Sequence, residues 1–378
     1  MEKRIRIISI TLFLSLSIIL TSCRNQKSEW KGSIEKENGV TIVKNPKEPM
    51  YGEDVFSLKE ELSLGEAKGR KEYMFSQIRN IDVDNEENIY VLDSKEFHIK
   101  VFDKDGKYLI SIGRPGQGPG EFELPTQIQI TSQKEIMVFD LPVRSLSFFS
   151  LSGEFLRRTP LTKMPVPALL VIDLNGDFIG RFTLMEERPK GALMKFFSKQ
   201  EKVLTIAKLD PYGSESYNLI KPTLPFDVTE ENNIIWAISS RYEIQIINSE
   251  GNLLKKVIKD DDPVEITEED KKRIIRGIYG RETIPPGRKA ELPKYFHPIG
   301  SIHIDNEGRI FVRTSKKSKD EKSYYYDVFD PEGRYIAKII LKAMPDTSLI
   351  WKRNKLYTIE EDEEGFQMVK RYKVTWKY

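Results

Sequence analysis

Apolar and polar residues alternate in short runs over Ile81–Phe155, and the pattern repeats after a shift of 47 residues. The two copies agree at both apolar and turn positions: Ile81 with Ile128, Val91 with Val138, Asp93 with Asp140, and Gly106 with Gly153. Alternation over a few residues predicts half-buried strands, and glycine between two such runs predicts a hairpin turn. Each copy therefore predicts four short antiparallel strands.

A repeat of this length that is built from short strands is typical of a β-propeller blade. A single blade cannot bury its own apolar faces, so the repeat predicts a closed ring of blades. The same pattern, weaker in the third copy, predicts five consecutive blades at 78–112, 127–161, 170–209, 226–258 and 302–340.

The sixth blade is predicted to combine strands from both ends of the chain. Ser63-Leu64-Gly65 resembles the outermost strand of the first blade, and three further strands are expected between Leu349 and Trp376. Joining them closes the ring and removes exposed sheet edges. The predicted fold class is all-β, a six-bladed β-propeller over residues 45–378, closed by an N-terminal strand in the C-terminal blade.

One connection is much longer than the others, at 259–300 between blades four and five. Thr267 is a suitable N-cap, and isoleucines follow at helical spacing, which predicts a helix over Glu268–Tyr279. Long connections in compact domains are often functional. We expect this insertion to lie over one face of the ring.

Residues 1–22 read as a targeting segment, with a basic start and an apolar run too short for a membrane span. Leu20-Thr21-Ser22-Cys23 resembles a bacterial lipobox, which implies cleavage before Cys23 and lipidation of its side chain. An ordinary secretory peptide with a stray cysteine is the alternative. Residues 23–44 are polar and predict a flexible tether. In the lipoproteins that the chain resembles, an aspartate near the mature N-terminus signals inner-membrane retention, so Asn25, two residues after Cys23, favours the outer membrane.

The charge and the cysteine content of the chain limit which binding partners and which disulfides are expected. With 60 basic and 58 acidic residues the net charge is +2, so nothing favours nucleic-acid binding. Cys23 is the only cysteine, so no disulfide within the chain is expected. The chain is expected to be a monomer in the cell envelope, attached to the membrane through its N-terminal lipid.

The glycine-rich stretch Gly113–Pro125 resembles the inter-blade signature of NHL-repeat propellers, as does the strand Ile136–Asp140. Together with the lipobox, these residues make the chain similar to six-bladed β-propeller lipoproteins of Gram-negative bacteria. No Lys-Ser/Thr pair and no helix follow the glycines, so the stretch is interpreted as a structural crossover rather than a phosphate loop.

Two sets of residues are candidates for ligand binding. Asp93 and Asp140 end equivalent second strands and face one mouth of the ring; they either serve a site or, as we favour, cap turns and tie adjacent loops. Arginines near the same edge would make that mouth basic and suited to a carboxylate-bearing glycan or peptide, or would form a solvated rim. The arginines are Arg79, Arg114, Arg144, Arg241 and Arg313.

The resemblance also implies an alternative function, because NHL-type propellers include zinc-dependent amidating lyases and the fold includes calcium-dependent lactonases. Zinc needs several converging ligands, and the three histidines, His98, His297 and His303, are widely spaced. We therefore expect no cofactor and no catalytic residue. The function expected is a non-enzymatic binding or scaffolding protein that recognises a protein, peptide or glycan on the face carrying the insertion.

Overall fold

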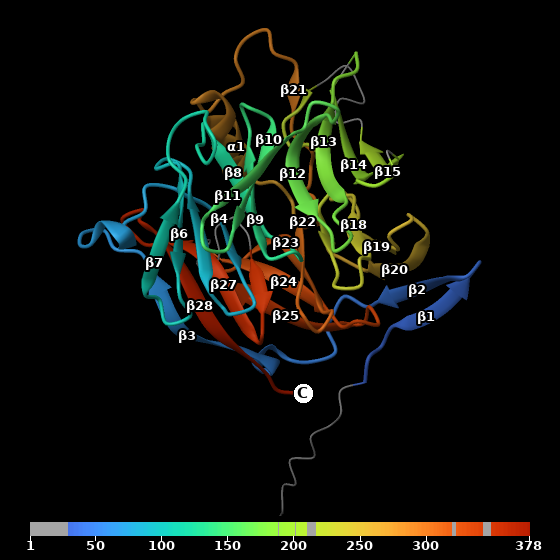
Figure 1. Cartoon of the computed structure of the whole chain (residues 1–378). Coiled ribbons are helices and arrows are strands. Elements are labelled where there is room, and N and C mark those ends of the chain that lie inside the picture. The colour runs from blue at the N-terminus through green and yellow to red at the C-terminus, as the bar shows by residue number, and fades with distance from the viewer. Residues whose placement is uncertain (1–28, 188, 201, 210–216, 320–322, 343–348) are drawn as a thin grey trace, which may run out of the picture.

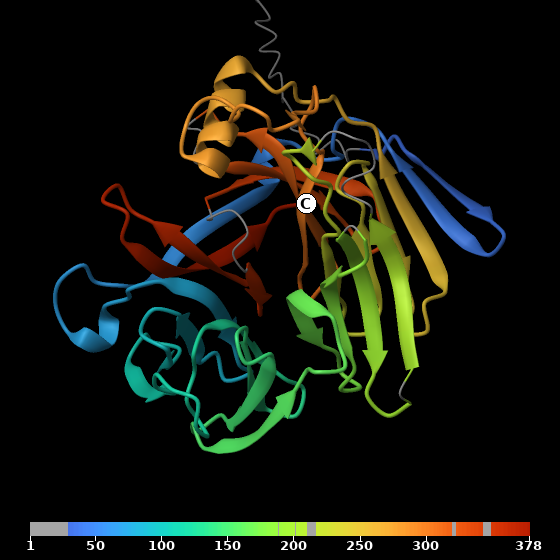
Figure 2. The same ribbon diagram turned by 90° about the horizontal axis from the view of Figure 1, so that it is seen from above.

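Six blades surround a common centre in the computed structural model, which describes residues 29–378 except 188, 201, 210–216, 320–322 and 343–348 (Figures 1 and 2). Five blades are four-stranded sheets, and the four strands of blade four belong to a six-stranded sheet. The prediction of an all-β six-bladed propeller is confirmed. Cys23, like the rest of residues 1–28, lies outside the described residues.

The first three blades follow one another along the chain. Blade one contains β4 (Ile78–Val83), β5 (Ile89–Asp93), β6 (His98–Phe102) and β7 (Tyr108–Ile112). Blade two contains β8 (Pro125–Ile130), β9 (Glu135–Asp140), β10 (Ser145–Ser150) and β11 (Phe155–Pro160). Blade three contains β12 (Val166–Ile172), β13 (Phe178–Leu184), β14 (Lys190–Phe197) and β15 (Lys202–Leu209).

The next two blades flank the insertion. Blade four contains β17 (Phe226–Val228), β18 (Ile234–Ala237), β19 (Glu243–Ile247) and β20 (Leu253–Lys259). Blade five contains β22 (Ile299–Ile304), β23 (Ile310–Lys317), β24 (Tyr324–Phe329) and β25 (Tyr335–Leu341). Between them, α1 (Glu268–Tyr279) and β21 (Ala290–Glu291) belong to the insertion, and β21 pairs with β16 (Tyr217–Asn218). Two short 3-10 helices, η1 (Glu53–Val55) and η2 (Lys71–Tyr73), flank β3.

Blade six is shared by the two ends of the chain, as the sequence predicts. It contains β26 (Ile350–Lys352), β27 (Lys355–Glu361), β28 (Gln367–Trp376) and β3 (Phe56–Leu64). The antiparallel pairing of β28 with β3 extends from Val369–Leu64 to Trp376–Phe56. The N-terminal strand therefore closes the ring.

The tether prediction is wrong from Ser33 onward. Residues there form a hairpin of β1 (Ser33–Glu37) and β2 (Val40–Asn45), and β2 pairs in parallel with β20 at the outer edge of blade four. Burial explains the docking, because Val43 is fully buried in the core between blades four and five. Trp30 packs against the same core and donates a 2.9 Å hydrogen bond to Asn45.

Residues 40–64, here called the N-terminal belt, cross three consecutive blades. The belt pairs with blade four through β2, crosses blade five through a 2.9 Å bond from Met50 N–H to the Tyr335 carbonyl, and enters blade six as β3. Asn45 fixes its position by donating to the Gly333 carbonyl at 2.9 Å and accepting from Tyr335 N–H at 2.7 Å. Closure thus involves more than the single strand that the sequence predicts.

Seven hairpin turns among the described residues share one local structure. At Asp103 the carboxylate accepts from the N–H groups two and four residues later, at 3.0 and 2.8 Å, and Gly106 between them has φ 82°. A short polar side chain satisfies the turn amides, and glycine adopts the left-handed conformation without strain. The same pattern of two bonds recurs at Asp84, Asp173, Thr229, Asn248, Asp305 and Asp362.

The predicted helix is confirmed at both ends. Thr267 caps α1 in a reciprocal capping box with Asp270, and Gly280 ends it with φ 66°. Only Ile275 of this helix is buried, so α1 is attached to the ring by a narrow apolar contact. In Figure 2 the helix lies toward the rim of the ring and not over its centre.

Candidate functional site

Asp93 and Asp140 have equivalent roles at the ends of β5 and β9. Asp93 is fully buried and accepts from Ser76 N–H at 2.7 Å and Gln77 N–H at 3.0 Å. Asp140 accepts at 2.8 and 2.9 Å from the matching amides, which belong to Glu123 and Leu124. Both carboxylates accept two amides from the segment that leads into the first strand of their own blade, and Asp93 also accepts from the Lys95 and Glu96 amides. The capping interpretation therefore fits the contacts of these two aspartates.

The five arginines lie on different blades and are held in different ways. Arg114, whose side chain is 74% exposed, forms a 2.9 Å salt bridge with Glu121. Arg144 donates to the Met164 carbonyl, and the guanidinium of Arg313 lies 5.0 Å from the ring of Tyr324.

Arg79 and Arg241 are exposed. Strand direction puts all five near the edge of the ring that carries the insertion, because that edge holds the second-to-third strand turns and the connections between blades. The ion pair, carbonyl and aromatic contacts described above hold Arg114, Arg144 and Arg313 separately, each near its own blade. These contacts do not join the five arginines into one cluster.

Polar side chains on the first strands connect each blade to the next. Asp82 on β4 accepts from Ile130 N–H at 2.6 Å, and Asp227 on β17 accepts from Ile304 N–H at 3.0 Å. Burial raises the pKa of both carboxyl groups to about 6, although backbone hydrogen bonds act in the opposite direction. These aspartates are inter-blade connectors, and they are half-buried where first strands line the centre of a propeller.

The histidines do not form a metal site. His303 on β22 is 3.1 Å from Ser301, and His297 in the insertion is 3.2 Å from the Ile220 carbonyl. Burial, with a smaller contribution from the charge of Arg313, lowers the pKa of His303 to about 4. No group of three or more histidine, cysteine or acidic residues that could hold a metal occurs within the described part of the chain.

The insertion is a fixed platform whose charges are segregated. It is held by the β16–β21 pair and by 3.0 and 2.9 Å backbone bonds that join Ile266 to Lys294 and Phe296 to Val264. Residues 259–270 contain seven acidic residues and one lysine, whereas residues 271–294 contain eight basic and two acidic residues. The second half of the insertion therefore carries an excess of positive charge.

Several cations in that basic half are exposed and form no salt bridge with any described residue. Arg273 and Arg276 are paired with Asp270 and Glu282. The exposed cations without such a pair are Lys272, Arg281, Arg288 and Lys289. In Figure 1 the insertion lies at the upper end of the molecule, and the described chain begins at the lower right, below β1.

A charged cavity of about 150 Å³ lies at the root of the insertion, between blades four and five. Its deepest residues are Lys259, Thr314 and Asp327, which are 6%, 4% and 1% exposed. The Lys259 ammonium is 3.1 Å from Asp327 and 3.4 Å from Asp261. The remaining lining residues are Lys47, Glu48, Asp260, Asp262, Lys316 and Lys338.

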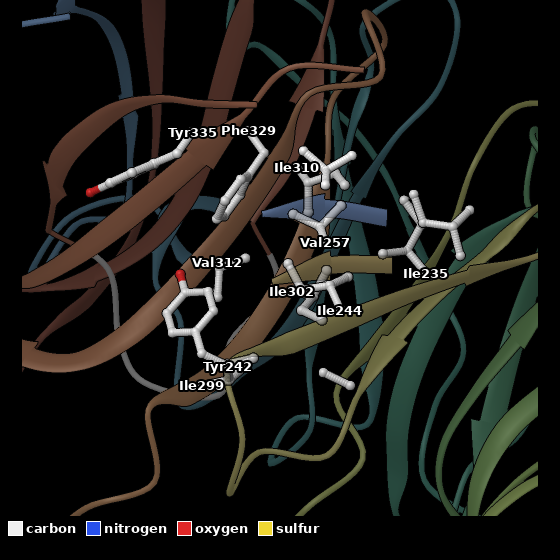
Figure 3. Packing of buried hydrophobic residues seen from close by; sticks show 13 residues of the cluster. Ile235, Tyr242, Ile244, Val257, Ile299, Ile302, Ile310, Val312, Phe329 and Tyr335 are labelled. Carbon is white, nitrogen blue, oxygen red and sulfur yellow. The ribbon is translucent and has the colours of Figure 1, made fainter. Parts of the chain in front are cut away.

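Two tyrosines support the buried ion pair from the apolar side. Tyr242 and Tyr335 donate their hydroxyls to Asp327 at 2.5 and 2.6 Å. Both rings belong to the core between blades four and five, where Figure 3 shows them beside Phe329 and Val312. Burial, then the charge of Asp327, raises the pKa of both hydroxyls, so they remain donors.

Comparison with known proteins agrees with this architecture. The sequence profile of DUF5128, described as a 6-bladed beta-propeller, matches residues 68–261, which is half of the chain. The chain belongs to the DUF5128 family.

Two solved structures resemble the DUF5128 propeller over most of its length. One is a putative exported protein from Bacteroides fragilis NCTC 9343, with 12% identity and a TM-score of 0.55, covering 89% of this chain and 100% of that one. The other, a DUF4221-family member from Bacteroides vulgatus ATCC 8482, has 11% identity and a TM-score of 0.57, with coverages of 86% and 100%. At these identities the likeness establishes the fold alone.

A third similarity is local. The protein brain tumor of Drosophila melanogaster is 23% identical over 113 residues, which is 29% of the DUF5128 chain but only 11% of that protein.

Within the described residues, no helix is long and apolar enough to cross a membrane.

Sequence reasoning missed the features that set the blade four–five junction of the DUF5128 propeller apart. The hairpin had a signal, because Asn38-Gly39 is a typical two-residue turn between the alternating residues of β1 and β2. The buried pair of Lys259 and Asp327 had none, because its members are 68 positions apart on different blades.

Proposed function

We propose that the protein is a lipid-anchored, non-enzymatic propeller of the bacterial cell envelope that binds a carboxylate-bearing partner, a glycan or a peptide, on its insertion. The observation that carries this proposal is the set of exposed, unpaired cations at Lys272, Arg281, Arg288 and Lys289. Guanidinium groups bind carboxylates in two-point contacts, and a localised positive potential accelerates encounter with anions.

The rigidity of the insertion supports binding. The capping box of α1, the β16–β21 pair and the backbone bonds to Lys294 and Val264 hold the basic segment at both ends. A surface that is already ordered loses less conformational entropy when a partner binds. The rim arginines Arg79 and Arg241, on the same edge of the ring, would extend the positive field around the insertion.

Lipidation of Cys23 would place the membrane at the other end of the molecule. Trp30 is docked on Asn45, so only Arg24–Glu29 would separate the lipid from the folded body. At roughly 3.5 Å per residue, such a segment reaches only about 20 Å. The insertion, at the opposite end in Figure 1, would face away from the bilayer and be open to an envelope partner. The exported relative from B. fragilis fits an envelope location.

Charge reversal on the insertion tests the binding role. Changing Arg281, Arg288 and Lys289 to glutamate should abolish binding to polygalacturonate or poly-glutamate, measured by biolayer interferometry at low salt. The matched control changes Lys104, Lys107 and Lys199, which are exposed in or beside third-to-fourth strand turns on the opposite edge. Equal binding by the two variants, or no binding of either polymer by the unmodified chain, would contradict the proposal.

The anchor has its own test. Expressed in a Gram-negative host, the full chain should incorporate labelled palmitate and partition with membranes, and Cys23→Ser should do neither. Palmitate labelling that persists in the Cys23→Ser chain, or no labelling of the unmodified chain, would contradict lipidation at Cys23.

A further inference from the structure

We propose that the cavity between blades four and five binds a small zwitterion, a free α-amino acid. The cavity is covered by residues 47–48 of the N-terminal belt and by the first residues of the insertion, and its deep wall comes from Lys259 of blade four and from Thr314 and Asp327 of blade five. Nothing in the proposed recognition of a large anionic partner uses this space.

The deep wall of the cavity is built and rigid. Lys259 lies between Asp327 and Asp261, and its ammonium is 4.4 Å from the ring of Tyr242 and 5.1 Å from the ring of Tyr335. Burying charged groups is costly unless they are paired and hydrogen-bonded, and this wall meets both conditions. The result is a fixed polar surface in a place where an apolar core would stabilise the fold more simply.

Nearer the mouth, charges of both signs have no salt-bridge partner among the residues that the structure describes. The Lys338 ammonium lies 4.7 Å from the ring of Tyr325, whereas Glu48 and Asp260 are exposed carboxylates. Lys316 shares Asp261 with Lys259, at 3.2 Å. Ammonium and carboxylate groups therefore face one cavity with capacity for further partners.

The lining and size select the class of ligand. A volume of about 150 Å³ holds about five water molecules at ~30 Å³ each, so a small molecule fits and a polymer does not. The charged lining disfavours a hydrocarbon. A simple anion would leave Glu48 and Asp260 without a positive partner, and a simple cation would leave Lys338 without a negative one. A zwitterion matches both, with its carboxylate at the lysines and its ammonium at the acids.

Thermal unfolding with defined probes tests this site. Glycine, alanine, glutamate and lysine are each added to the full chain up to about 50 mM, because a ligand that binds only the folded state raises the Tm as its concentration exceeds Kd. At least one amino acid should raise the Tm, and acetate and methylammonium at equal concentration should raise it much less. Calorimetric titration of that amino acid then gives the affinity.

Two substitutions at the mouth locate the site without disturbing the buried wall. Lys338→Met and Glu48→Gln should each lower the affinity for the amino acid by roughly tenfold or more, because each removes one charged contact. Lys104→Met and Glu363→Gln, on exposed turns elsewhere, are the matched controls and should leave the affinity unchanged.

Three outcomes would overturn the proposal: no amino acid shifts the Tm, acetate alone matches the amino acids, or the mouth variants bind as well as their controls. The charge-reversed insertion variant should bind the amino acid normally. Failure of polymer binding and failure of this site are therefore separate results.

Discussion

The junction between blades one and two and the junction between blades four and five share the same inner contact but differ in everything outside it. At both, an aspartate on the first strand accepts an amide of the next blade, through Asp82 and Ile130 in one and Asp227 and Ile304 in the other. Outside that contact, blades one and two are joined by the short glycine-rich crossover, whereas blades four and five are joined by belt, insertion and cavity.

The crossover is a self-contained packing unit. Gly113 has φ 90°, and a Cβ there would lie 2.1 Å from the ring of Phe122. Glu121 accepts from Gly118 N–H at 2.8 Å, and Arg158 donates to the carbonyls of the same loop. The hydrogen bonds named for this loop are made within it or to Asp140 and Arg158 of blade two. The comparison indicates that the regular junction is scaffold and that the irregular junction holds polar structure beyond what the scaffold needs.

The largest difference between the junctions should come from removing one buried aspartate in each. Asp327→Ala leaves two buried tyrosine hydroxyls without an acceptor and leaves the Lys259 ammonium with only the more distant Asp261, at 3.4 Å, so it should lower the free energy of unfolding by about 3–5 kcal/mol. Asp140→Ala loses two amide bonds and should lower it by about 1–3 kcal/mol. Urea unfolding measures both values. A larger loss for Asp140→Ala than for Asp327→Ala would show that the buried Lys259–Asp327 pair is less important for stability than the capping aspartate.

The crossover itself should be sensitive to a single methyl group. Gly113→Ala combines left-handed backbone strain with a clash against Phe122 and should lower the free energy of unfolding by about 2–4 kcal/mol. Gly287→Ala, at φ 79° but with nothing within 4 Å, should lower it by only about 1 kcal/mol. Comparable losses at the two glycines would mean that the close approach to Phe122 is absent in solution.

A smaller effect is expected where the belt is fixed. Asn45→Ala removes the bonds to Trp30, Gly333 and Tyr335 and should lower the free energy of unfolding by about 1–3 kcal/mol. The same substitution should make tryptophan fluorescence more sensitive to a soluble quencher, because the Trp30 indole loses its hydrogen-bond acceptor and becomes more accessible. Asn175→Ala, in an exposed turn, serves as the control. Identical stability of the two variants would contradict a docked belt.

The pH dependence of stability should be the same at both junctions. The folded pKa of Asp82 and of Asp227 is raised from 3.8 to about 6, so each contributes stability that is present below pH 3.8 and lost as the pH rises through 6. Asp82→Asn and Asp227→Asn should each flatten the stability profile between these values, by similar amounts. A steeper profile in either variant would reverse the sign of the shift. Unfolding curves at several pH values measure it.

Sequence reasoning recovered what the repeat encodes. Alternating residues and turn glycines predicted the blades, Ser63-Leu64-Gly65 predicted the closing strand, and Thr267 predicted the start of α1. These features depend on residues close together in the chain or on an internal repeat. The hairpin of β1 and β2 was missed although Asn38-Gly39 marked its turn, because β1 has no buried residue and the polar composition concealed it.

The candidate site was beyond reach for a different reason. Lys259, Asp327, Tyr242 and Tyr335 meet only after two blades are packed together, and no local pattern encodes that meeting. The arginines were predicted from strand ends and do lie near one edge, but strand position alone does not determine whether side chains converge. The exposed cations of the insertion required knowing which residues are paired.

The central claim is that the N-terminal segment is an ordered belt over blades four to six rather than a tether, since this closes the ring and roofs the cavity. Hydrogen exchange over residues 33–64, followed by mass spectrometry, tests it most directly. The amides of β2 should exchange as slowly as those of β20, with which they pair. Exchange of β2 at the rate of an unstructured peptide, with β20 protected, would contradict the account.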